Sequence, residues 1–367
     1  MSADVKDFWN ALTVDTETAY DLLLLSVEAG TTAMMWGQYG VGKTSIFHQL
    51  MKSLMDEKIP ASARFDGYIV INPSQIDIID LKLPYVKTED TGDVVSKFAY
   101  SNILPRKGRW GLLVDEINTA PQSLQASLYN LILEGGIGDY RMPPGSIRFA
   151  AGNREEDACA AQPMSAALKD RLNLHMFVVP TAKCWGSWAV RNGIRSDLQA
   201  WVQSDPIVSL RGHNPDDPTG GSTPRSLEAL SKKLSALDAK PFSAEKKKKL
   251  QESILYGTIG QGAASQLTGF LDLYHNQISL DAILRDPENY KVPTGPKAPS
   301  LIYCMTYGLA ERMNTSNIGA AMTFLERISP SYVQVALDIA MNRKDSGINI
   351  NTPQVLSFYR RNVQLIV

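Results

Sequence analysis

The sequence predicts an α/β fold in the first half of the chain and an all-helical fold in the second. Up to about residue 180, short apolar runs alternate with helical patterns, which is typical of a parallel sheet with right-handed helical connections. Beyond residue 180, strand patterns are hard to find. A glycine-rich segment at residues 37–44 lies between an apolar run and a helical pattern, a context typical of phosphate-binding loops.

Length and composition indicate an ordinary globular protein with more than one domain. The 367 residues are enough for two or three domains. Hydrophobic residues make up 44% of the chain and charged residues 20%, which is typical of proteins that bury a large core. The formal net charge of -1 gives no overall field that would attract nucleic acid or an anionic membrane.

Cysteine and histidine usage favours a protein of a reducing compartment without a zinc site. The three cysteines, Cys159, Cys184 and Cys304, are scattered, and the four histidines lie far apart. The N-terminal residues lack the apolar core of a signal peptide, and no apolar run approaches the ~20 residues of a membrane helix. We therefore expect a cytoplasmic protein that does not contact a membrane.

Five apolar runs are expected to form the sheet, with helices between them. The predicted strands are residues 32–36, 67–72, 111–114, 147–153 and 176–179. The predicted helices of this half are residues 16–30, 45–51, 121–134 and 165–172. Asn72, at the end of the second run, has two interpretations: it holds a catalytic carboxylate in an inactive pose, or it is an ordinary turn residue, and the second is favoured.

Residues 37–44 read GQYGVGKT and fit the phosphate-binding pattern G-x-x-x-x-G-K-[ST]. Glycines let backbone N–H groups turn toward phosphate oxygens, and the N-terminus of the following helix adds partial positive charge. The pattern predicts that Lys43 reaches the β- and γ-phosphates of a nucleotide and that the Thr44 hydroxyl holds Mg²⁺. The predicted nucleotide-binding residues of this segment are Gly37, Gln38, Tyr39, Gly40, Val41, Gly42, Lys43, Thr44 and Ser45.

Two adjacent carboxylates, Asp115 and Glu116, follow the apolar run at residues 111–114. Asp115 at a strand end is placed to hold Mg²⁺, as the Walker B aspartate does, and Glu116 is then placed to polarise an attacking water. A surface turn is the competing interpretation, because buried carboxylates without a cation are costly. The apolar run directly before the pair favours the metal and water-activating roles.

Two connections in the α/β half are expected to carry function. Residues 73–104 look irregular but are too apolar for a solvated loop, and connections of this length are usually functional insertions. Their mixed charges favour contact with protein over contact with a phosphate backbone. Residues 135–147 predict a hairpin with a Pro-Gly turn.

The second half of the chain reads as helices joined by proline-rich loops. One helical stretch is expected over residues 185–202, another opens at Pro224, and an amphipathic helix begins near Glu245. Four lysines at residues 246–249 resemble a nucleic-acid patch, but the run lies between Glu245 and Glu252, which favours a solvated helix face. Further helices are predicted over residues 263–274, 301–312, 320–328 and 331–343.

The order of these motifs resembles that of the AAA+ ATPases, and within them the MoxR family. Residues 115–121 and 125–128, DEINTAP and QASL, are similar to the MoxR signature D-E-I-N-R-A-x-x-x-x-Q-x-x-L. Residues 150–153 look like the family's sensor 1 strand, and residues 167–172 look like its L-x-x-A-L-x-D-R-F segment. Residues 223–225 resemble its S-P-R sensor 2, so the likeness spans roughly residues 15–275.

The resemblance implies an AAA+ αβα nucleotide-binding core with a parallel sheet over residues 1–180. An all-α lid over residues 181–275 and a helical C-terminal extension over residues 276–367 would follow. It also implies a ring, usually a hexamer, with ATP and Mg²⁺ between subunits. The insertion at 73–104 and the hairpin at 135–147 would face the pore or the client.

The resemblance assigns further roles around the nucleotide. Asn153 would orient the attacking water beside Glu116, and Arg225 would contact the γ-phosphate from the lid. Arg171 would reach a neighbour's γ-phosphate as an arginine finger, stabilising charge that develops in the transition state. An ion pair with Asp170 is the competing interpretation of Arg171. If Arg171 has no such role, the remaining candidates for the finger are Arg148, Arg154 and Arg225.

The chain departs from the MoxR pattern at two positions. Tyr39 stands where many members have proline, which should be tolerated because the position does not depend on glycine. Thr119 stands where many members have arginine, so no cationic role is inferred there.

Three functions fit these motifs. The first is a chaperone that couples ATP hydrolysis to the remodelling, maturation or cofactor insertion of a partner, often one with a von Willebrand factor A domain. The second is a nucleic-acid motor, which would want a hairpin rich in basic and aromatic side chains. The third is a structural subunit that binds ATP but barely hydrolyses it. The hairpin offers only Tyr140, Arg141 and Arg148, and the catalytic residues are intact, so we expect the first function.

Overall fold

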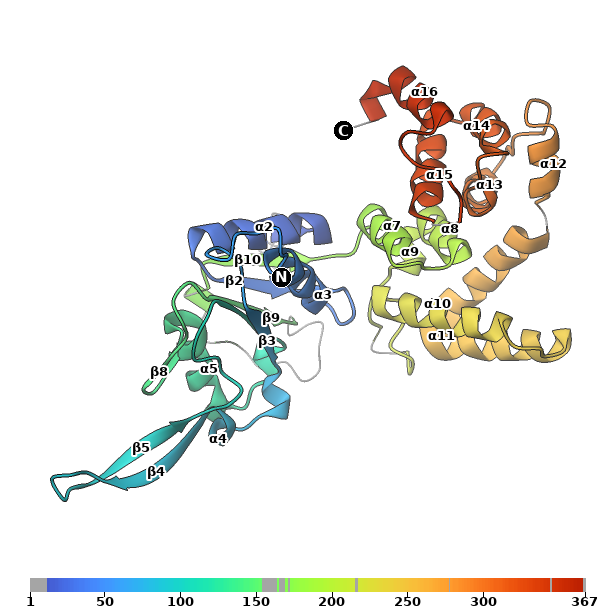
Figure 1. The fold of residues 1–367 in the computed structure, drawn as a ribbon. Coiled ribbons are helices and arrows are strands. Elements are labelled where there is room, and N and C mark those ends of the chain that lie inside the picture. Colours follow the sequence, from blue (N-terminus) through green and yellow to red (C-terminus); the bar gives the residue numbers. More distant parts are fainter. Residues whose placement is uncertain are drawn as a thin grey trace, which may run out of the picture. The chain divides into compact units, whose positions relative to one another are not determined.

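A computed structural model describes residues 12–153, 164, 169–170, 172–214, 217–276, 278–343 and 345–365 (Figure 1). The chain divides into two compact units, residues 1–180 and residues 181–367. The predicted α/β class of the first unit and the helical class of the second are confirmed. Within the described residues, every helix is too short or too polar to span a lipid bilayer.

A six-stranded parallel sheet forms the centre of unit 1, with the strand order β1-β10-β2-β9-β6-β3. The strands are β1 (Thr13–Val14), β2 (Ala33–Trp36), β3 (Gly67–Ile71), β6 (Trp110–Val114), β9 (Ile147–Gly152) and β10 (Leu174–Val178). The five apolar runs predict all of them except β1, which at 2 residues is too short to show a pattern.

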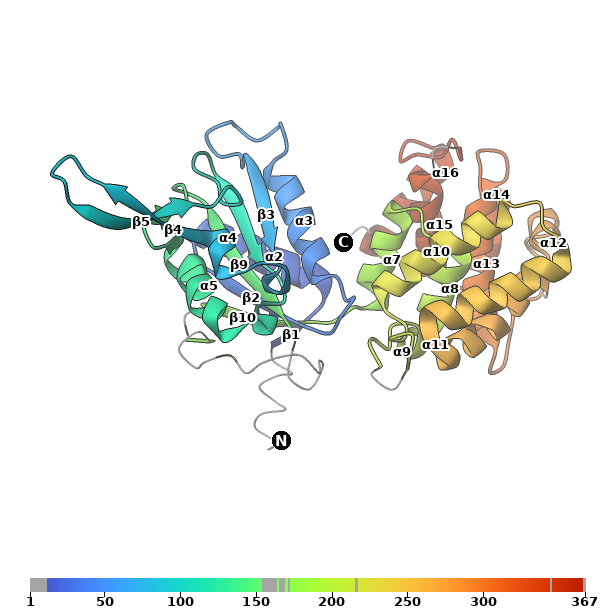
Figure 2. The same ribbon diagram turned by 90° about the horizontal axis from the view of Figure 1, so that it is seen from below.

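Helices cover both faces of this sheet, which gives the predicted αβα layers (Figures 1 and 2). Helices α2 (Thr16–Ala29) and α3 (Lys43–Leu54) pack on one face, and α5 (Gln122–Glu134) packs on the other. Successive side chains of a strand point to opposite faces, so Met35 joins the first of these cores and Met34 the second. Because both faces are covered, every residue of β2 is buried, and its sequence is continuously apolar.

Residues 73–104 are not irregular, as the sequence suggested, but form ordered structure. A turn of helix, η1 (Pro73–Gln75), and a short helix, α4 (Ile78–Leu81), lead into a long antiparallel hairpin. Its strands are β4 (Lys82–Thr88) and β5 (Val94–Tyr100), and the hairpin projects away from the sheet of unit 1 (Figures 1 and 2). The pattern failed here because both faces of β4 are largely exposed, so the strand lacks the alternation of a half-buried strand.

A smaller hairpin at the predicted place joins α5 to β9, but its turn is not the Pro-Gly turn. The strands β7 (Gly136–Ile137) and β8 (Tyr140–Arg141) are connected through Gly138, whose φ of 56° suits a tight hairpin turn. Residues 143–146 instead form the bend that leads into β9, closed by a 3.2 Å hydrogen bond from Ser146 N to Pro143 O.

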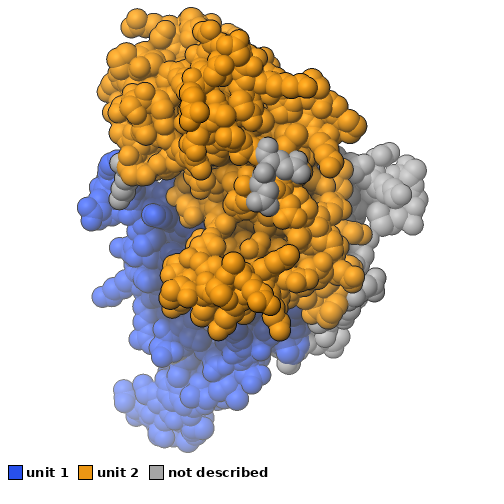
Figure 3. Space-filling model, turned by 90° about the vertical axis from the view of Figure 1, so that its right-hand side faces the viewer, with its two compact units in different colours: residues 1–180 blue, residues 181–367 orange. Residues whose placement is uncertain are grey.

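Unit 2 (orange in Figure 3) is helical throughout its described residues. Its helices are α7 (Ala182–Arg191), α8 (Ser196–Ser204), α9 (Pro206–Ser209), α10 (Pro224–Asp238), α11 (Ala244–Asn276), α12 (Leu280–Arg285), α13 (Ala298–Arg312), α14 (Ile318–Glu326), α15 (Pro330–Asn342) and α16 (Pro353–Arg361).

Two details of unit 2 differ from the sequence prediction. The single helical stretch expected over residues 185–202 is two helices, because Gly193 between them takes a left-handed φ of 64°. Helices α9, α12 and α16 were not predicted, and α9 and α12, with 4 and 6 residues, are too short for a clear periodic pattern. Three of the lysines at residues 246–249 are exposed at the start of α11, as expected for a solvated face.

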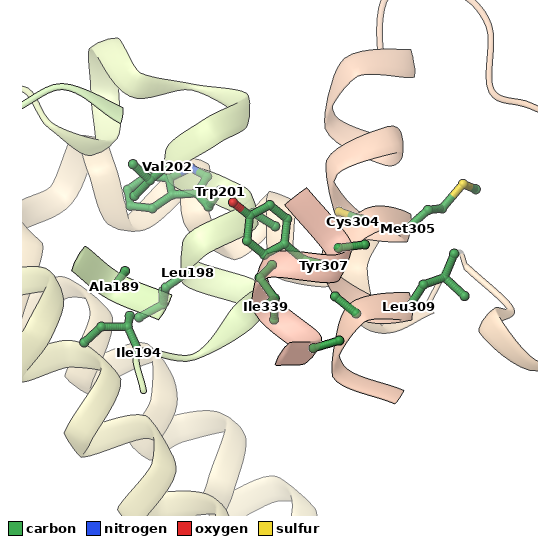
Figure 4. Close-up of a cluster of buried hydrophobic side chains, with 14 of the residues drawn as sticks. Ala189, Ile194, Leu198, Trp201, Val202, Cys304, Met305, Tyr307, Leu309 and Ile339 are labelled. Atoms are coloured by element: carbon green, nitrogen blue, oxygen red, sulfur yellow. The ribbon is translucent and has the colours of Figure 1, made fainter. Parts of the chain in front are cut away.

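The helices before and after residue 275 share one hydrophobic core. Leu198 and Trp201 of α8 belong to the same buried cluster as Tyr307 of α13 and Ile339 of α15 (Figure 4). The division of this unit into a lid (residues 181–275) and an extension (residues 276–367) stays a prediction.

Candidate functional site

The predicted site residues gather at one edge of the sheet, where four neighbouring strands end. In sheet order, β2 leads into Gly37, β9 into Asn153, β6 into Asp115 and β3 into Asn72. The carboxyl ends of parallel strands lie at a common edge, and open α/β sheets bind their ligands there. Residues 116 positions apart in the chain, Gly37 and Asn153, are therefore brought together by the strand order alone.

The glycine-rich loop between β2 and α3 has the backbone of an anion-binding loop. Gly37, Gly40 and Gly42 have φ values of 157°, 75° and 108°. A Cβ on Gly37 would lie 2.8 Å from the carbonyl oxygen of Val178, so the loop approaches the end of β10 closely. Gly42 provides no side-chain cap for α3, and the N-terminus of this helix can therefore bind phosphate oxygens.

Lys43 is buried within this loop, with an exposed fraction of 7%. Its ammonium donates to Gly37 O at 2.6 Å, to Gln38 O at 3.0 Å and to Asn153 Oδ1 at 2.9 Å. All three acceptors are uncharged oxygens. This ammonium lies in the first residue of α3, where the helix N-terminus also favours negative charge, so a phosphate group could bind beside it.

Asn153 supplies a second unusual group beside the ammonium. The residue is 1% exposed, and its Nδ2 has no hydrogen-bond partner within the described residues. An ammonium can only donate, so the amide atom that faces Lys43 is the oxygen. Nδ2 is bonded to the same carbon as that oxygen and therefore lies next to the ammonium. A buried donor without an acceptor costs free energy, and an acceptor atom of a bound ligand would remove this cost.

Thr44 and Asp115 lie together and offer oxygen atoms only. The Thr44 hydroxyl donates to Asp115 Oδ2 at 2.5 Å, and both side chains are half-buried. The other carboxylate oxygen, Oδ1, accepts from the Glu116 backbone N–H at 3.0 Å. A hydroxyl and a carboxylate are hard oxygen ligands of the kind that Mg²⁺ binds beside phosphates, so these residues fit the predicted metal.

Glu116 has the only positive φ among the described residues other than glycine, with φ 53° and ψ 41°. Such a conformation costs about 1–3 kcal/mol and persists where the surrounding structure enforces it, often at functional sites. The turn η2 (Ile117–Thr119) follows directly, and the Thr119 hydroxyl donates to Glu116 O at 2.8 Å.

Asn72 makes the hydrogen bonds of a turn residue and also contacts Glu116, whereas the inactive pose stays a prediction. Its Oδ1 accepts from the Ser74 backbone N–H at 3.1 Å and from the Ser74 hydroxyl at 2.8 Å, which is a turn function. Its Nδ2 donates to Glu116 Oε2 at 3.4 Å. The end of β3 therefore contacts the carboxylate predicted to activate water.

Of the predicted arginines, only Arg148 and Arg225 lie among the described residues. Arg171 lies outside the described residues, as does Arg154. Arg225 belongs to unit 2, where its side chain is exposed in the first turn of α10. Arg148 donates through Nε to Ile132 O at 2.7 Å and so binds the C-terminal end of α5, and burial lowers the pKa of its guanidinium.

The remaining predicted residues have ordinary surroundings, and one residue was missed. Val41 is buried at 4% exposure, whereas the Ser45 side chain is exposed on α3. Asn118, to which the sequence gave no role, is 2% exposed and hydrogen-bonded to the backbone of Asn153. Its place in the D-E-I-N segment, 3 residues after Asp115, was the available signal.

Comparison with solved structures returns matches that include distant likenesses of low sequence identity. No family model matches the chain, and no curated protein matches it. A point mutant of RuvB from Thermotoga maritima is 16% identical, with 72% of this chain and 79% of that chain covered and a TM-score of 0.38. NtrX from Brucella abortus, in complex with ADP, is 13% identical, with 96% of this chain and 70% of that chain covered and a TM-score of 0.32. These similarities are too low to assign a family.

Replacing Lys43 should weaken nucleotide binding selectively. Lys43→Ala removes the buried cation, and we expect ATP affinity to fall about a hundredfold, because hydrogen bonds to charged groups contribute about 1.5–3 kcal/mol each. Lys52→Ala is the matched control, since Lys52 is an exposed lysine of the same helix. Isothermal titration calorimetry with ATP measures both variants. Equal affinities of Lys43→Ala and wild type would contradict the phosphate-binding role of this loop.

Proposed function

We propose that this chain is an AAA+ ATPase of the MoxR type, which hydrolyses ATP in a ring and thereby remodels a partner protein. The observation that carries the nucleotide part is the buried Lys43 ammonium next to the unpartnered Nδ2 of Asn153. A cation and a donor buried side by side favour an anion with several oxygens, such as the phosphates of ATP. The motif order along the chain supports the AAA+ and MoxR parts.

The chemistry at the sheet edge supports hydrolysis beyond binding. Thr44 and Asp115 would hold Mg²⁺, which, when bound, neutralises charge on the phosphates. Glu116, directly after Asp115, would accept a proton from the attacking water, and Asn72 would hold its carboxylate through the 3.4 Å contact to Oε2. Asn153 would orient that water or a phosphate oxygen through its unpartnered Nδ2.

The ring part of the proposal rests on the resemblance of residues 167–172 and 223–225 to AAA+ motifs. Arg171 would reach the ATP of a neighbouring subunit, and Arg225 would contact the γ-phosphate from the lid. A hexamer is the ring size proposed, because that is usual among proteins with these motifs.

The hairpin β4–β5 supports a protein as the partner. Paired residues of antiparallel strands share a face, so Pro84, Val86, Val94 and Phe98 lie on one face of the hairpin. Val86 is 72% exposed and Val94 is 71% exposed. An apolar surface on a projecting element suits contact with polypeptide, and partners of MoxR-like proteins often carry a von Willebrand factor A domain.

A nucleic-acid motor is the second candidate, and the small hairpin argues against it. Such a motor would stack bases on exposed aromatic rings and bind phosphates with free basic groups. Tyr140 is 5% exposed, and its hydroxyl donates to Pro105 O at 2.7 Å. Arg148 is held by the carbonyls of α5, so of the three residues named for this role only Arg141 is exposed. Cys184 and Cys304 are buried and form no disulfide, which suits a reducing compartment. We therefore propose a cytoplasmic protein without a nucleic-acid partner.

Neutralising Glu116 should separate hydrolysis from binding. In Glu116→Gln the amide cannot accept a proton from water, and we expect ATP turnover to fall about a hundredfold or more, while ATP affinity changes little. Glu134→Gln, at an exposed glutamate of α5, is the control and should hydrolyse ATP like wild type. Steady-state phosphate release measures both. Turnover at the wild-type rate in Glu116→Gln would mean that another residue activates the water.

An arginine finger in trans makes a specific prediction for mixed rings. Arg171→Ala should bind ATP but not hydrolyse it, and Lys43→Ala should do neither. Mixing the two variants places an intact Arg171 beside an intact Lys43 loop at some interfaces, so ATPase activity should reappear in the mixture. Native mass spectrometry confirms that mixed rings form. If mixed rings form and stay inactive at every ratio, Arg171 does not act across an interface.

Changing the apolar face of the hairpin should uncouple partner capture from hydrolysis. In extracts of the native host, some proteins should cross-link to the Glu116→Gln variant, which is the parent. The same proteins should not cross-link when Val86→Ser and Val94→Ser are added to this parent. Lys87→Ser, on the opposite face of β4, is the control and should retain them. If the parent binds a single-stranded oligonucleotide and the double variant binds it equally well, the nucleic-acid motor is favoured instead.

A further inference from the structure

The buried side chain of Asn118 joins the ends of two neighbouring strands. Asn118 lies on the turn η2, which follows β6, whereas Asn153 follows β9, and the ladder between these strands ends at the pair Val114 and Ala150. Beyond that point, Asn118 Nδ2 donates to Asn153 O at 2.5 Å, and Asn118 Oδ1 accepts from Asn153 N at 3.3 Å. One side-chain amide therefore satisfies both backbone groups of Asn153.

The orientation of this amide follows from its partners. A carbonyl oxygen only accepts and a backbone N–H only donates, so the nitrogen of Asn118 must face Asn153 O and the oxygen must face Asn153 N. An aspartate cannot make the first of these bonds, and an aliphatic residue makes neither. The preceding Gly152 admits the contact, because a Cβ there would lie 2.7 Å from Asn118 Oδ1.

Fixing the backbone of Asn153 fixes what its side chain does. The Oδ1 of Asn153 contacts the Lys43 ammonium at 2.9 Å, and the unpartnered Nδ2 lies beside it. If the backbone of Asn153 rotated, Oδ1 would leave the ammonium and Nδ2 would change direction. Both Asn118 and Asn153 are almost fully buried, at 2% and 1% exposure, so neither is held by solvent.

We propose that Asn118 is a positioning residue for ATP hydrolysis, acting through Asn153 without touching the nucleotide. This inference rests on the proposed function. Asn118 holds the Asn153 backbone, which keeps the Nδ2 donor aimed at one place relative to Lys43. A donor that is already oriented toward an oxygen of the reacting groups stabilises the transition state without reorganisation. Asn118 also joins the Asp115–Glu116 segment to the strand that carries Asn153, so the two parts of the site move together.

The test is a double-mutant cycle between the two asparagines. Asn118→Ala should lower kcat about tenfold to a hundredfold, because small misplacements of a reacting or orienting group cost up to about a hundredfold, with little change in the affinity for ATP. In the Asn153→Ala background the same change should lower kcat by less than about twofold, since the side chain through which it acts is gone. Thermal stability should fall in both backgrounds, because Asn153→Ala retains the backbone groups that Asn118 binds.

A matched control is available at the opposite edge of the same sheet. Asn173 Oδ1 accepts from the Thr32 backbone N–H at 3.2 Å and from the Thr32 hydroxyl at 2.9 Å, which joins the starts of β10 and β2. Asn173→Ala should therefore lower thermal stability but leave kcat within about twofold of wild type, since it lies away from the reacting edge. If Asn118→Ala fails to fold, Asn118→Ser, which keeps a short polar side chain, replaces it in the same cycle.

The outcomes separate this inference from the proposed function. If Asn118→Ala lowers kcat equally in the wild-type and in the Asn153→Ala background, the positioning role is overturned. The ATPase proposal would then still stand. A loss of kcat in Asn173→Ala as large as in Asn118→Ala would also overturn it, because kcat would then follow stability alone. Wild-type protein that neither binds nor hydrolyses ATP would overturn both proposals.

Discussion

The buried ammonium of Lys43 is the interaction on which the rest of unit 1 depends. A positive charge with 7% exposure needs surrounding oxygens, and the fold supplies them from three directions: two carbonyls of its own loop and the side chain of Asn153. The loop carbonyls require the positive φ of the glycines. The amide requires that β9 lies beside β2. Loop conformation and strand order are therefore both tied to one charged group.

A second layer of contacts keeps this edge of the sheet in place. Asn118 joins the end of β6 to the end of β9, and Asn72 joins the end of β3 to Glu116. Glu116 lies between these two contacts. It is the only residue other than glycine with a positive φ in the described part of the chain. Strain of this kind persists because its neighbours are fixed on both sides, and here the fixed neighbours are Asp115, bonded to Thr44, and the turn η2.

The projecting hairpin shows why the sheet was easier to predict than its insertion. The strands of the sheet are buried on both faces, so burial demands continuous apolar runs such as residues 111–114. Strands β4 and β5 pair only with each other and are largely exposed. Their sequences therefore need no continuous apolar run. The same freedom leaves Val86 and Val94 on the surface, where only a contact outside the described chain would bury them.

The sequence by itself predicted the glycine-rich loop before a helix, the carboxylate pair at a strand end and the α/β class, because each depends on residues that are adjacent in the chain. A glycine pattern and an apolar run followed by Asp115 and Glu116 are local features, and local features survive without knowledge of the fold. Only the tertiary structure decided that Asn118 binds the backbone of Asn153, 35 residues away, and that Asn153 Nδ2 has no partner among the residues that the structure describes. Those facts depend on which strands are neighbours and on how an amide is oriented between them. Neither property is encoded in the spacing of residues along one chain.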